Sequence, residues 1–403
     1  MGRQEEEASQ ACKERNSSSA GAYFNVVCII AGTGTLNLPE AIGKSGWVGI
    51  VLILVSAVFA LYSGNLLIEC LYATEDRMET FPDVGEAAFG RAGRIVVQVF
   101  SYALMLGVAA VFIMLIALGG QNLGPRLFGV ALADQHWVMI SGLLVMIPYV
   151  LFRNMREVGF LSIFGALATL VVIVVVIFIG FLKPPSYTPV HKGVILEGLA
   201  PALATISFSF GGNVVYPHVE ASMRNPHMWR RMLLMAISTI AAMYLVIGVV
   251  GYWVYGSAVK APITNSLHEG IPAQMATLFI TLHVIAAAPI LLCSFSLEME
   301  AAFNMHRLSP IKEHLARYIS RILLVAILTV IVMYVKSFGA LMTLVGALAN
   351  CMIVYVLPIA CHLKLKGVKS KPFYELGFIL LILVVAAYAG FLGTRDAIME
   401  LTR

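Results

Sequence analysis

Long apolar segments alternate along the chain with short polar connections. A membrane-spanning helix needs about 20 apolar residues, and unbroken apolar runs favour helices over the alternating pattern of membrane β-strands. We predict eleven segments, with approximate bounds 21–45, 47–71, 95–119, 136–153, 157–182, 196–220, 231–255, 272–298, 317–336, 338–363 and 373–394. The pattern therefore predicts an all-α membrane protein with eleven transmembrane helices and no inserted soluble domain.

Two of these segments contain a glycine-rich interruption near the middle, at residues 31–39 and 207–217. Helices in lipid must satisfy their backbone internally, so such clusters need a structural reason. Close helix packing through small residues is one reason. However, the clusters begin roughly 180 residues apart, and each opens a block of five segments. This predicts two inverted five-helix repeats, 21–182 and 196–363, with discontinuous helices 1 and 6 and an eleventh helix at 373–394.

Composition and charge placement agree with a membrane protein. The chain is 60% hydrophobic and 12% charged, whereas soluble domains carry about 25% charged residues. The net charge of +5 comes from basic residues between the apolar segments, so nucleic acid is not an expected partner. With a cytosolic N-terminus, 19 of the 27 Lys and Arg residues lie inside and 8 outside. This bias predicts a cytosolic N-terminus, a lumenal or extracellular C-terminus and a disordered cytosolic tail at 1–20.

One inside loop has a pattern of its own, at residues 81–90. Phe81, Val84, Ala88 and Phe89 can share a helical face, and Pro82 suits a first helical position. We expect a short surface helix here, with a solvated loop as the alternative.

The two interruptions also predict a binding site. Half-helix N-termini offer free amide groups that suit a carboxylate, and half-helix C-termini offer carbonyls that suit an ammonium group or a cation. A zwitterionic amino acid matches both. The candidate substrate-binding residues are Thr33, Gly34, Thr35 and Asn37 in the first break, Ser209, Gly211, Gly212 and Asn213 in the second, and Tyr102 on the third segment.

Ionisable residues within spans are costly and are often functional. His283 in the eighth segment and Glu40 after the first break are the candidates for proton coupling, although a hydrogen-bonded structural histidine is an equal alternative. Four glutamates near inner span ends are expected to be interfacial or paired with inside arginines: Glu69, Glu220, Glu298 and Glu300.

Patterns typical of enzymes are missing from the sequence. The Gly32-Thr33-Gly34 triplet follows no strand and completes no nucleotide fingerprint. The six cysteines show neither a disulfide framework nor a metal spacing. We expect no catalysis, no cofactor and no bound metal.

At both breaks the sequence resembles the amino acid/auxin permease family, and its vacuolar and vesicular members most of all. The matching residues are Ala31-Gly32-Thr33-Gly34-Thr35-Leu36-Asn37-Leu38-Pro39, Gly46-Trp47, Ala87-Ala88-Phe89-Gly90, Phe208-Ser209-Phe210-Gly211-Gly212, Asn213-Val214-Val215, Tyr216-Pro217 and Glu220-Ala221-Ser222-Met223-Arg224. The resemblance covers the chain beyond its tail. It implies a fold like the bacterial leucine transporter and secondary active amino-acid transport, commonly coupled to protons, across a vacuolar, vesicular or plasma membrane.

Three positions bear on substrate and ion. Many relatives have glycine in place of Asn37 and an aromatic residue in place of Glu40, so substrate preference stays open. Sodium-coupled relatives have an asparagine where this chain has Cys28, a poor ligand for a hard cation, which favours protons or exchange. An amino-acid receptor with little flux and a channel are the alternatives. The oligomeric state is left open.

Overall fold

The computed structural model describes residues 17–127, 129, 132–151, 159–302 and 309–402. Within these ranges every extended regular element is a helix, and one isolated bridge pairs Ser17 with Met223. The predicted tail at 1–20 lies mostly outside the described residues.

The first half of the chain holds the elements up to residue 182. They are α2 (Ser19–Ile30), the 3₁₀ helix η1 (Thr33–Asn37), α3 (Leu38–Ser45), α4 (Gly49–Leu71), α5 (Phe81–Leu127), α6 (Asp134–Leu151) and α7 (Gly159–Leu182). α2, η1 and α3 together occupy the first predicted segment, so the expected interruption is present.

The second half repeats this order of a broken helix followed by long ones. Its main elements are α8 (Leu199–Ser209), α9 (Tyr216–Ser222), α10 (Trp229–Tyr255), α11 (Ile271–Ala302), α12 (Pro310–Met333), α13 (Phe338–Val345), the π-helix η8 (Gly346–Val356), α14 (Leu357–Lys366) and α15 (Phe373–Leu401). Short 3₁₀ turns join them: η3 (Leu196–Gly198), η4 (Pro226–Met228), η5 (Gly256–Ala258), η6 (Ile263–Ser266) and η9 (Val368–Ser370). α8 and α9 divide the sixth predicted segment.

Nine helical stretches among the described residues are long and apolar enough to cross a membrane. The two remaining predicted segments are helical as well where the structure describes them: residues 136–151 lie in α6, and 196–220 holds η3 and the pair α8 and α9. Large apolar side chains are exposed along the outer helices, for example Ile311 on α12 and Phe391 on α15. Such exposure suits contact with lipid, so the chain is a multi-pass integral membrane protein.

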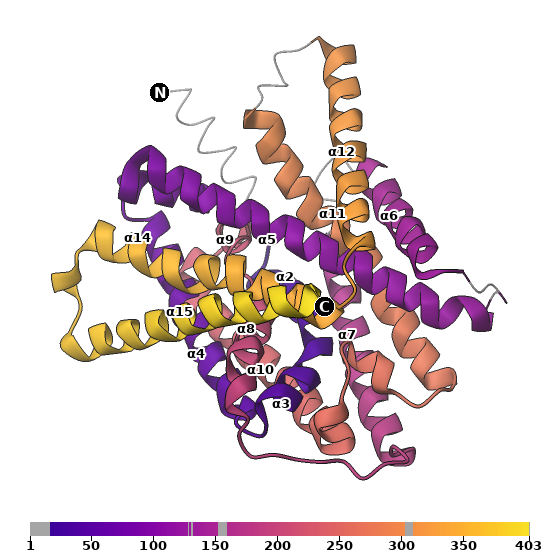
Figure 1. The fold of residues 1–403 in the computed structure, drawn as a ribbon. Helices are drawn as coiled ribbons and strands as arrows, with labels where there is room; N and C mark the ends of the chain where they lie inside the picture. The colour runs from indigo at the N-terminus through magenta and orange to yellow at the C-terminus, as the bar shows by residue number, and fades with distance from the viewer. Residues whose placement is uncertain (1–16, 128, 130–131, 152–158, 303–308, 403) are drawn as a thin grey trace.

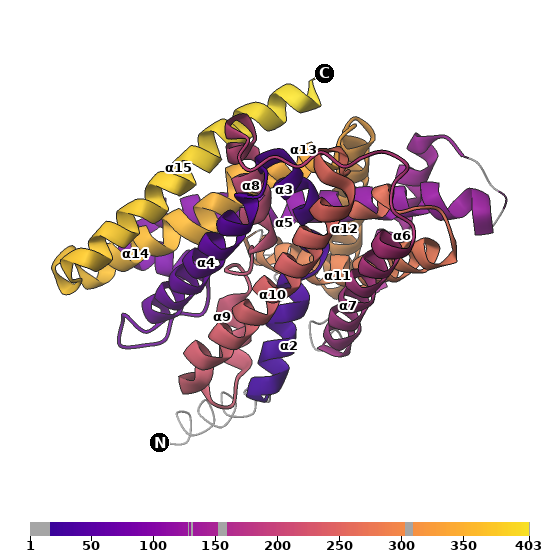
Figure 2. The same ribbon diagram turned by 90° about the horizontal axis from the view of Figure 1, so that it is seen from below.

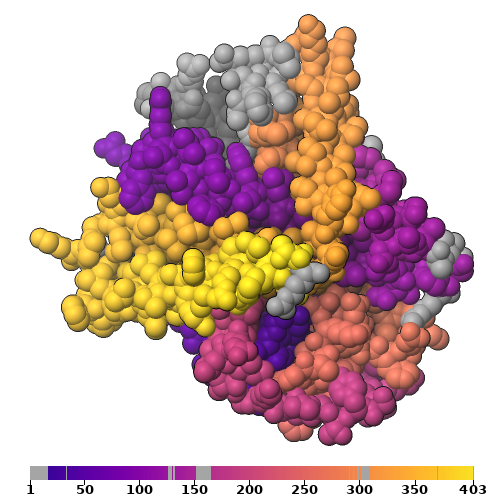
Figure 3. All heavy atoms as spheres, in the orientation of Figure 1, coloured from indigo at the N-terminus to yellow at the C-terminus, as the bar shows by residue number. Residues whose placement is uncertain are grey.

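The broken helices lie at the centre of the bundle. The apolar window of Ser19–Ser45 is 88% buried, the highest value among the nine stretches, and little of this indigo segment reaches the face seen in Figure 3. In Figure 2, α3 and α8 lie toward one end of the molecule and α2 and α9 toward the other. The two broken helices therefore run in opposite directions, while α12 projects at the top of Figure 1 and α15 lies along the outer edge in Figure 2.

The short helix expected at 81–90 is present as the first turns of α5. A kink at Phe89 and Gly90 separates it from the long part of α5, and Gly90 has φ +66°, which favours glycine. Phe81, Val84 and Ala88 are buried as predicted, but Phe89 is 47% exposed. The expectation that Phe89 shares their face is wrong, because the backbone leaves helical geometry at that residue.

Candidate functional site

The first break begins where α2 ends at Ile30. The Ala31 amide donates to Val27 O at 2.8 Å, and Gly32 then has a non-helical ψ of −114°. Thr35 is fully buried, and its hydroxyl donates to Ala31 O at 2.6 Å. A threonine hydroxyl thus satisfies a carbonyl that the interruption frees, as predicted for such a break. The side chain of Thr33 lies outside the described residues.

The second break spans the six residues between α8 and α9. The amides of Gly211 and Gly212 donate to Phe208 O at 3.1 Å and to Phe210 O at 2.9 Å, so tight turns replace the helix. Helical structure resumes at Tyr216, with Pro217 in the first turn, where proline is tolerated. Ser209 and Asn213, at the two sides of the glycine pair, are both buried.

The two breaks are in direct contact. A Cβ placed on Gly34 would lie 2.7 Å from Ser209 Cα. The Ser209 hydroxyl lies 3.3 Å from Gly34 O and 2.9 Å from Thr205 O, with which it can form hydrogen bonds. The residues predicted from two distant parts of the chain therefore meet, and glycine at position 34 is what allows this approach.

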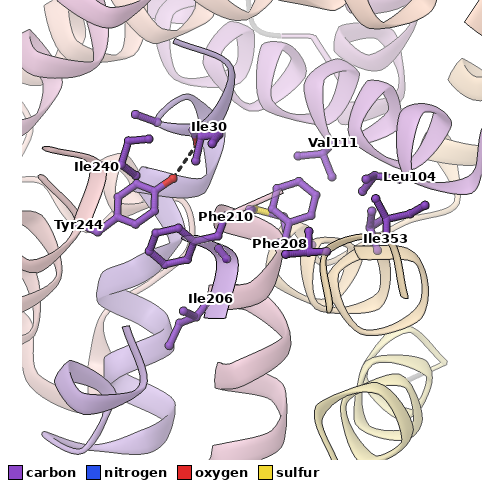
Figure 4. Close-up of a cluster of buried hydrophobic side chains, with 14 of the residues drawn as sticks. Ile30, Leu104, Val111, Ile206, Phe208, Phe210, Ile240, Tyr244 and Ile353 are labelled. Atoms are coloured by element: carbon purple, nitrogen blue, oxygen red, sulfur yellow. Dashed lines mark hydrogen bonds between the residues drawn. The ribbon is translucent and has the colours of Figure 1, made fainter. Parts of the chain in front are cut away.

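A tyrosine that the sequence did not single out joins the two half-helices. The Tyr244 hydroxyl on α10 lies 2.7 Å from Ile30 O and 2.5 Å from Ser209 O, at the C-terminal ends of α2 and α8 (Figure 4). It has one proton for these two acceptors. The C-terminal ends of α2 and α8, each with a partial negative charge from its helix dipole, thus meet at the Tyr244 hydroxyl. Such a place suits a cationic group. The only signal in the sequence was a polar aromatic residue within the apolar segment 231–255.

A small cavity lies beside the two breaks. Its volume is about 50 Å³, which is room for a few water molecules. No charged side chain is among the lining residues that the structure describes. These are Ile29, Ile30, Gly34, Leu104, Met105, Val108, Phe112, Phe208, Gly211, Val214, Val215 and Leu291. In Figure 4 the Phe208 ring points toward Leu104 and Val111 of α5, whereas Phe210 lies on the Tyr244 side. Backbone at the breaks and apolar side chains therefore form the site.

His283 lies beside the first break. A Cβ on Gly32 would be 3.1 Å from its Nε2, and one on Gly165 of α7 would be 2.4 Å from its Nδ1 and 2.6 Å from Cys28 Sγ. The ring is 3% exposed. Glycines in the first break and on α7 thus make room for a buried imidazole next to the C-terminal end of α2.

Of the predicted site residues, Gly34 and Gly211 are the two among the described lining residues of the cavity. Three others make polar or aromatic contacts elsewhere, or none. Asn37 is fully buried, and neither end of its amide has a hydrogen-bond partner among the described residues. The Tyr102 ring packs edge-on against Phe295 at a centroid distance of 5.0 Å. Glu40 pairs with Lys44 at 3.1 Å, one turn further along α3.

The expected pairing of inner glutamates with arginines is confirmed for three of the four. Glu220 accepts hydrogen bonds from Arg77 at 2.6 and 2.9 Å. Glu300 contacts Arg317 at 3.1 Å, and Glu69 contacts Arg230. The side chain of Glu298 lies outside the described residues.

The connections around α9 form the most extensive of these contacts. Besides Glu220, Arg77 reaches Pro217 O at 2.8 Å, and the Tyr72 hydroxyl donates to Glu220 at 2.5 Å. Burial and this contact with Glu220 raise the pKa of Tyr72. The Ser17 amide donates to Ser222 O at 2.9 Å. Both the segment before α2 and the α4–α5 connection therefore hold the C-terminal half of the sixth span.

Comparison with known proteins agrees with this arrangement. Residues 15–399 match the family described as transmembrane amino acid transporter protein, so the chain belongs to that family. The Arabidopsis thaliana amino acid transporter AVT1I is 28% identical over 98% of this chain and 99% of its own length. The amino acid transporter AVT1C of the same plant is 26% identical over 96% of this chain and 70% of its own length.

Solved transporters share the fold. A Na⁺-coupled sialic acid symporter superposes with a TM-score of 0.62 at 13% identity, covering 96% of this chain and 90% of that one. The Eremococcus coleocola manganese transporter gives a TM-score of 0.61 at 12% identity, covering 94% and 87%. The architecture is therefore that of a helical membrane transporter.

Proposed function

We propose that this protein is a secondary active transporter that carries amino acids by alternating access, with the substrate bound between the breaks of the first and sixth spans. The observation that carries this proposal is the convergence of Ile30 O and Ser209 O, at two helix C-termini, on Tyr244. The names of the two Arabidopsis relatives, both amino acid transporters, support it.

The two ends of a zwitterion suit different parts of the breaks. Carbonyls at the ends of α2 and α8 attract an ammonium group, whereas the amides at residues 32–35 suit a carboxylate. The apolar cavity lining favours an apolar substrate side chain. Because the cavity holds only a few waters, its walls must separate to admit an amino acid.

The first and sixth spans are held by contacts at both of their ends in this structure, which fits an occluded state. On the α2 and α9 side, Arg77 and Glu220 form the closing contact. On the α3 and α8 side, Lys44 lies 3.7 Å from Glu400 of α15, and the Trp47 amide donates to Lys192 O at 3.0 Å. Alternating access would open one set of contacts at a time.

We assign the topology from the charge bias and the broken helices. Eleven transmembrane helices, with inverted repeats at 21–182 and 196–363 and a further helix at 373–394, place the two termini on opposite sides of the membrane. The charge bias assigns the N-terminal side to the cytosol. The α2 and α9 end would then face the cytosol. Resemblance to vacuolar and vesicular permeases favours an internal membrane over the plasma membrane.

Proton coupling through His283 is the ion mechanism that the geometry favours. Burial disfavours a protonated imidazole, and the C-terminal end of α2 beside the ring offsets part of that cost. Cys28 nearby is a poor sodium ligand. Glu40 is the second candidate, although Lys44 already compensates its charge.

Replacing His283 with glutamine should uncouple transport from protons. We expect His283→Gln to lose pH-driven accumulation in liposomes while it still exchanges labelled for unlabelled amino acid, since glutamine fills the space without titrating. Accumulation equal to that of the wild type would exclude His283 as the coupling residue.

A bulky side chain at Gly211 should abolish transport. A Cβ there would already lie 2.4 Å from Asn350 Oδ1 and 3.0 Å from Phe208 O, so Gly211→Leu must displace Asn350 or the second break. We expect no uptake in liposomes with normal membrane insertion. The control is Gly377→Leu on α15, where nothing lies within 4 Å of a Cβ. Normal uptake by Gly211→Leu would remove the proposed site.

A further inference from the structure

The tenth predicted segment contains an eleven-residue π-helix, η8, between α13 and α14. π-Helical turns are rare and occur frequently at functional sites, because they widen the helix and re-aim side chains. η8 carries a fully buried asparagine, Asn350. No sequence pattern marks this residue, since an isolated amide in an apolar segment has many structural uses.

Two asparagines connect η8 with the second break in both directions. Asn350 Nδ2 donates to Ser207 O at 2.5 Å, on the last turn of α8. In return, Asn213 Nδ2 lies 3.2 Å from Val354 O on η8. A carbonyl oxygen can only accept a hydrogen bond, so each amide must present its nitrogen to it. The orientation of Asn350 is therefore fixed, with Oδ1 on the opposite side from Ser207 O.

The Oδ1 atom of Asn350 is buried and has no hydrogen-bond partner among the described residues. It faces Gly211, where a Cβ would lie only 2.4 Å away. Gly211 also lines the cavity between the breaks. An unpaired acceptor in an apolar environment is unfavourable and needs an explanation, of which a ligand is one. Here it lies directly behind a residue of the proposed substrate site.

Among the described residues, no acidic side chain lines the cavity to bind an ammonium group. The two nearest helix-end carbonyls, Ile30 O and Ser209 O, already share the proton of Tyr244. An ammonium group has three N–H donors and needs further acceptors in a site that excludes water. Asn350 Oδ1 is an acceptor without a partner among the described residues, and it lies next to Gly211, which lines the cavity.

We propose that Asn350 is a specificity-determining residue whose Oδ1 accepts a hydrogen bond from the ammonium group of the substrate. The inference rests on the proposed function, because it takes the substrate to be an amino acid bound at Gly211. It assigns η8 a direct part in substrate recognition, beyond its packing against α8. Asn350 thereby distinguishes amino acids from carboxylic acids of the same shape.

The test compares leucine with 4-methylpentanoate, which has the same side chain and carboxylate but no ammonium group. Inhibition of labelled-leucine exchange by each compound is measured with the full chain in liposomes. In Asn350→Leu we expect the inhibition constant of leucine to rise roughly 10-fold or more, the usual effect of losing a hydrogen bond to a charged group. The constant of 4-methylpentanoate should stay unchanged, so the preference for leucine falls.

Thr343→Val is the matched control for packing. The Thr343 hydroxyl lies 2.9 Å from that of Thr205, so this change also removes a buried hydrogen bond between the sixth and tenth spans, away from Gly211. It should leave the preference unchanged. An Asn350→Leu variant that weakens both compounds equally, or neither, would overturn the proposal.

Asn350→Asp covers the case in which Asn350→Leu does not fold. It keeps an oxygen toward Gly211, and its protonated form can still donate to Ser207 O, so we expect the preference for leucine to persist. Loss of that preference in a folded Asn350→Asp protein would contradict the role of Oδ1. A wild-type protein that neither binds nor transports any amino acid would instead refute the proposed function.

Discussion

Gly34→Ala is expected to reduce transport at least 10-fold, although it adds a single methyl group. That methyl would lie 2.7 Å from Ser209 Cα and 2.8 Å from Ser209 Cβ, so backbone must move. Overpacking of this kind costs typically 1–3 kcal/mol, and here the strain falls at the contact between the two breaks. Initial uptake rates in liposomes at matched protein content measure the effect.

Gly377→Ala provides the comparison for this substitution. Its Cβ would meet nothing within 4 Å, and alanine is the better helix former. It should transport as the wild type does. If Gly34→Ala also transported normally, the contact between Gly34 and Ser209 would have no part in the transport cycle.

Glu220→Gln is expected to open the end of the molecule where α2 and α9 meet. Glu220 is fully buried and pairs with Arg77 at 2.6 Å, and breaking a buried ion pair costs about 3–5 kcal/mol. This cost destabilises only the state that is closed at the α2 and α9 end. The ratio of the state open on this side to the closed state should therefore rise by roughly 100-fold or more. Uptake should fall because the return step becomes unfavourable.

The shift can be measured by thiol labelling. Ile29 lines the central cavity, so an Ile29→Cys substitution reports access from the α2 and α9 side. We expect Glu220→Gln to speed its labelling from that side, and Glu86→Gln, which loses only an exposed pair with Arg94, to leave it unchanged. Equal labelling in both variants would show that the Arg77–Glu220 pair does not close this end.

The position of the helices and their two interruptions followed from the sequence because both depend on local properties. Apolar length sets each span, and glycine clusters with nearby hydroxyl groups predict where helical geometry ends. The pairing of Glu69, Glu220 and Glu300 followed from charge placement alone, since buried carboxylates need partners. The helix at 81–90 was predictable as far as Ala88. At Phe89 and Gly90 the backbone kinks, so the Phe89 side chain is exposed and does not join the buried face.

The residues that sequence reasoning missed depend on contacts between distant helices. Tyr244 lies 214 residues from Ile30, and Asn350 lies 143 residues from Ser207. No local pattern marks either residue, and the π-helix of η8 has no recognised signal in the sequence. Conversely, Glu40 was proposed for proton coupling without regard to Lys44 four residues later, a spacing that places both on one helix face. Tyr102 and Asn37 lie on predicted elements but are not among the described residues that line the cavity.

The measurement that tests the central claim most directly is leucine accumulation in sodium-free liposomes that contain the purified full chain, with a pH gradient of either sign across the membrane. We predict that labelled leucine rises inside above its external concentration with one sign of gradient, and that a protonophore collapses this accumulation. Equilibration without accumulation under either gradient would indicate a channel, and saturable binding without flux would indicate a receptor. Either result would contradict secondary active transport coupled to protons.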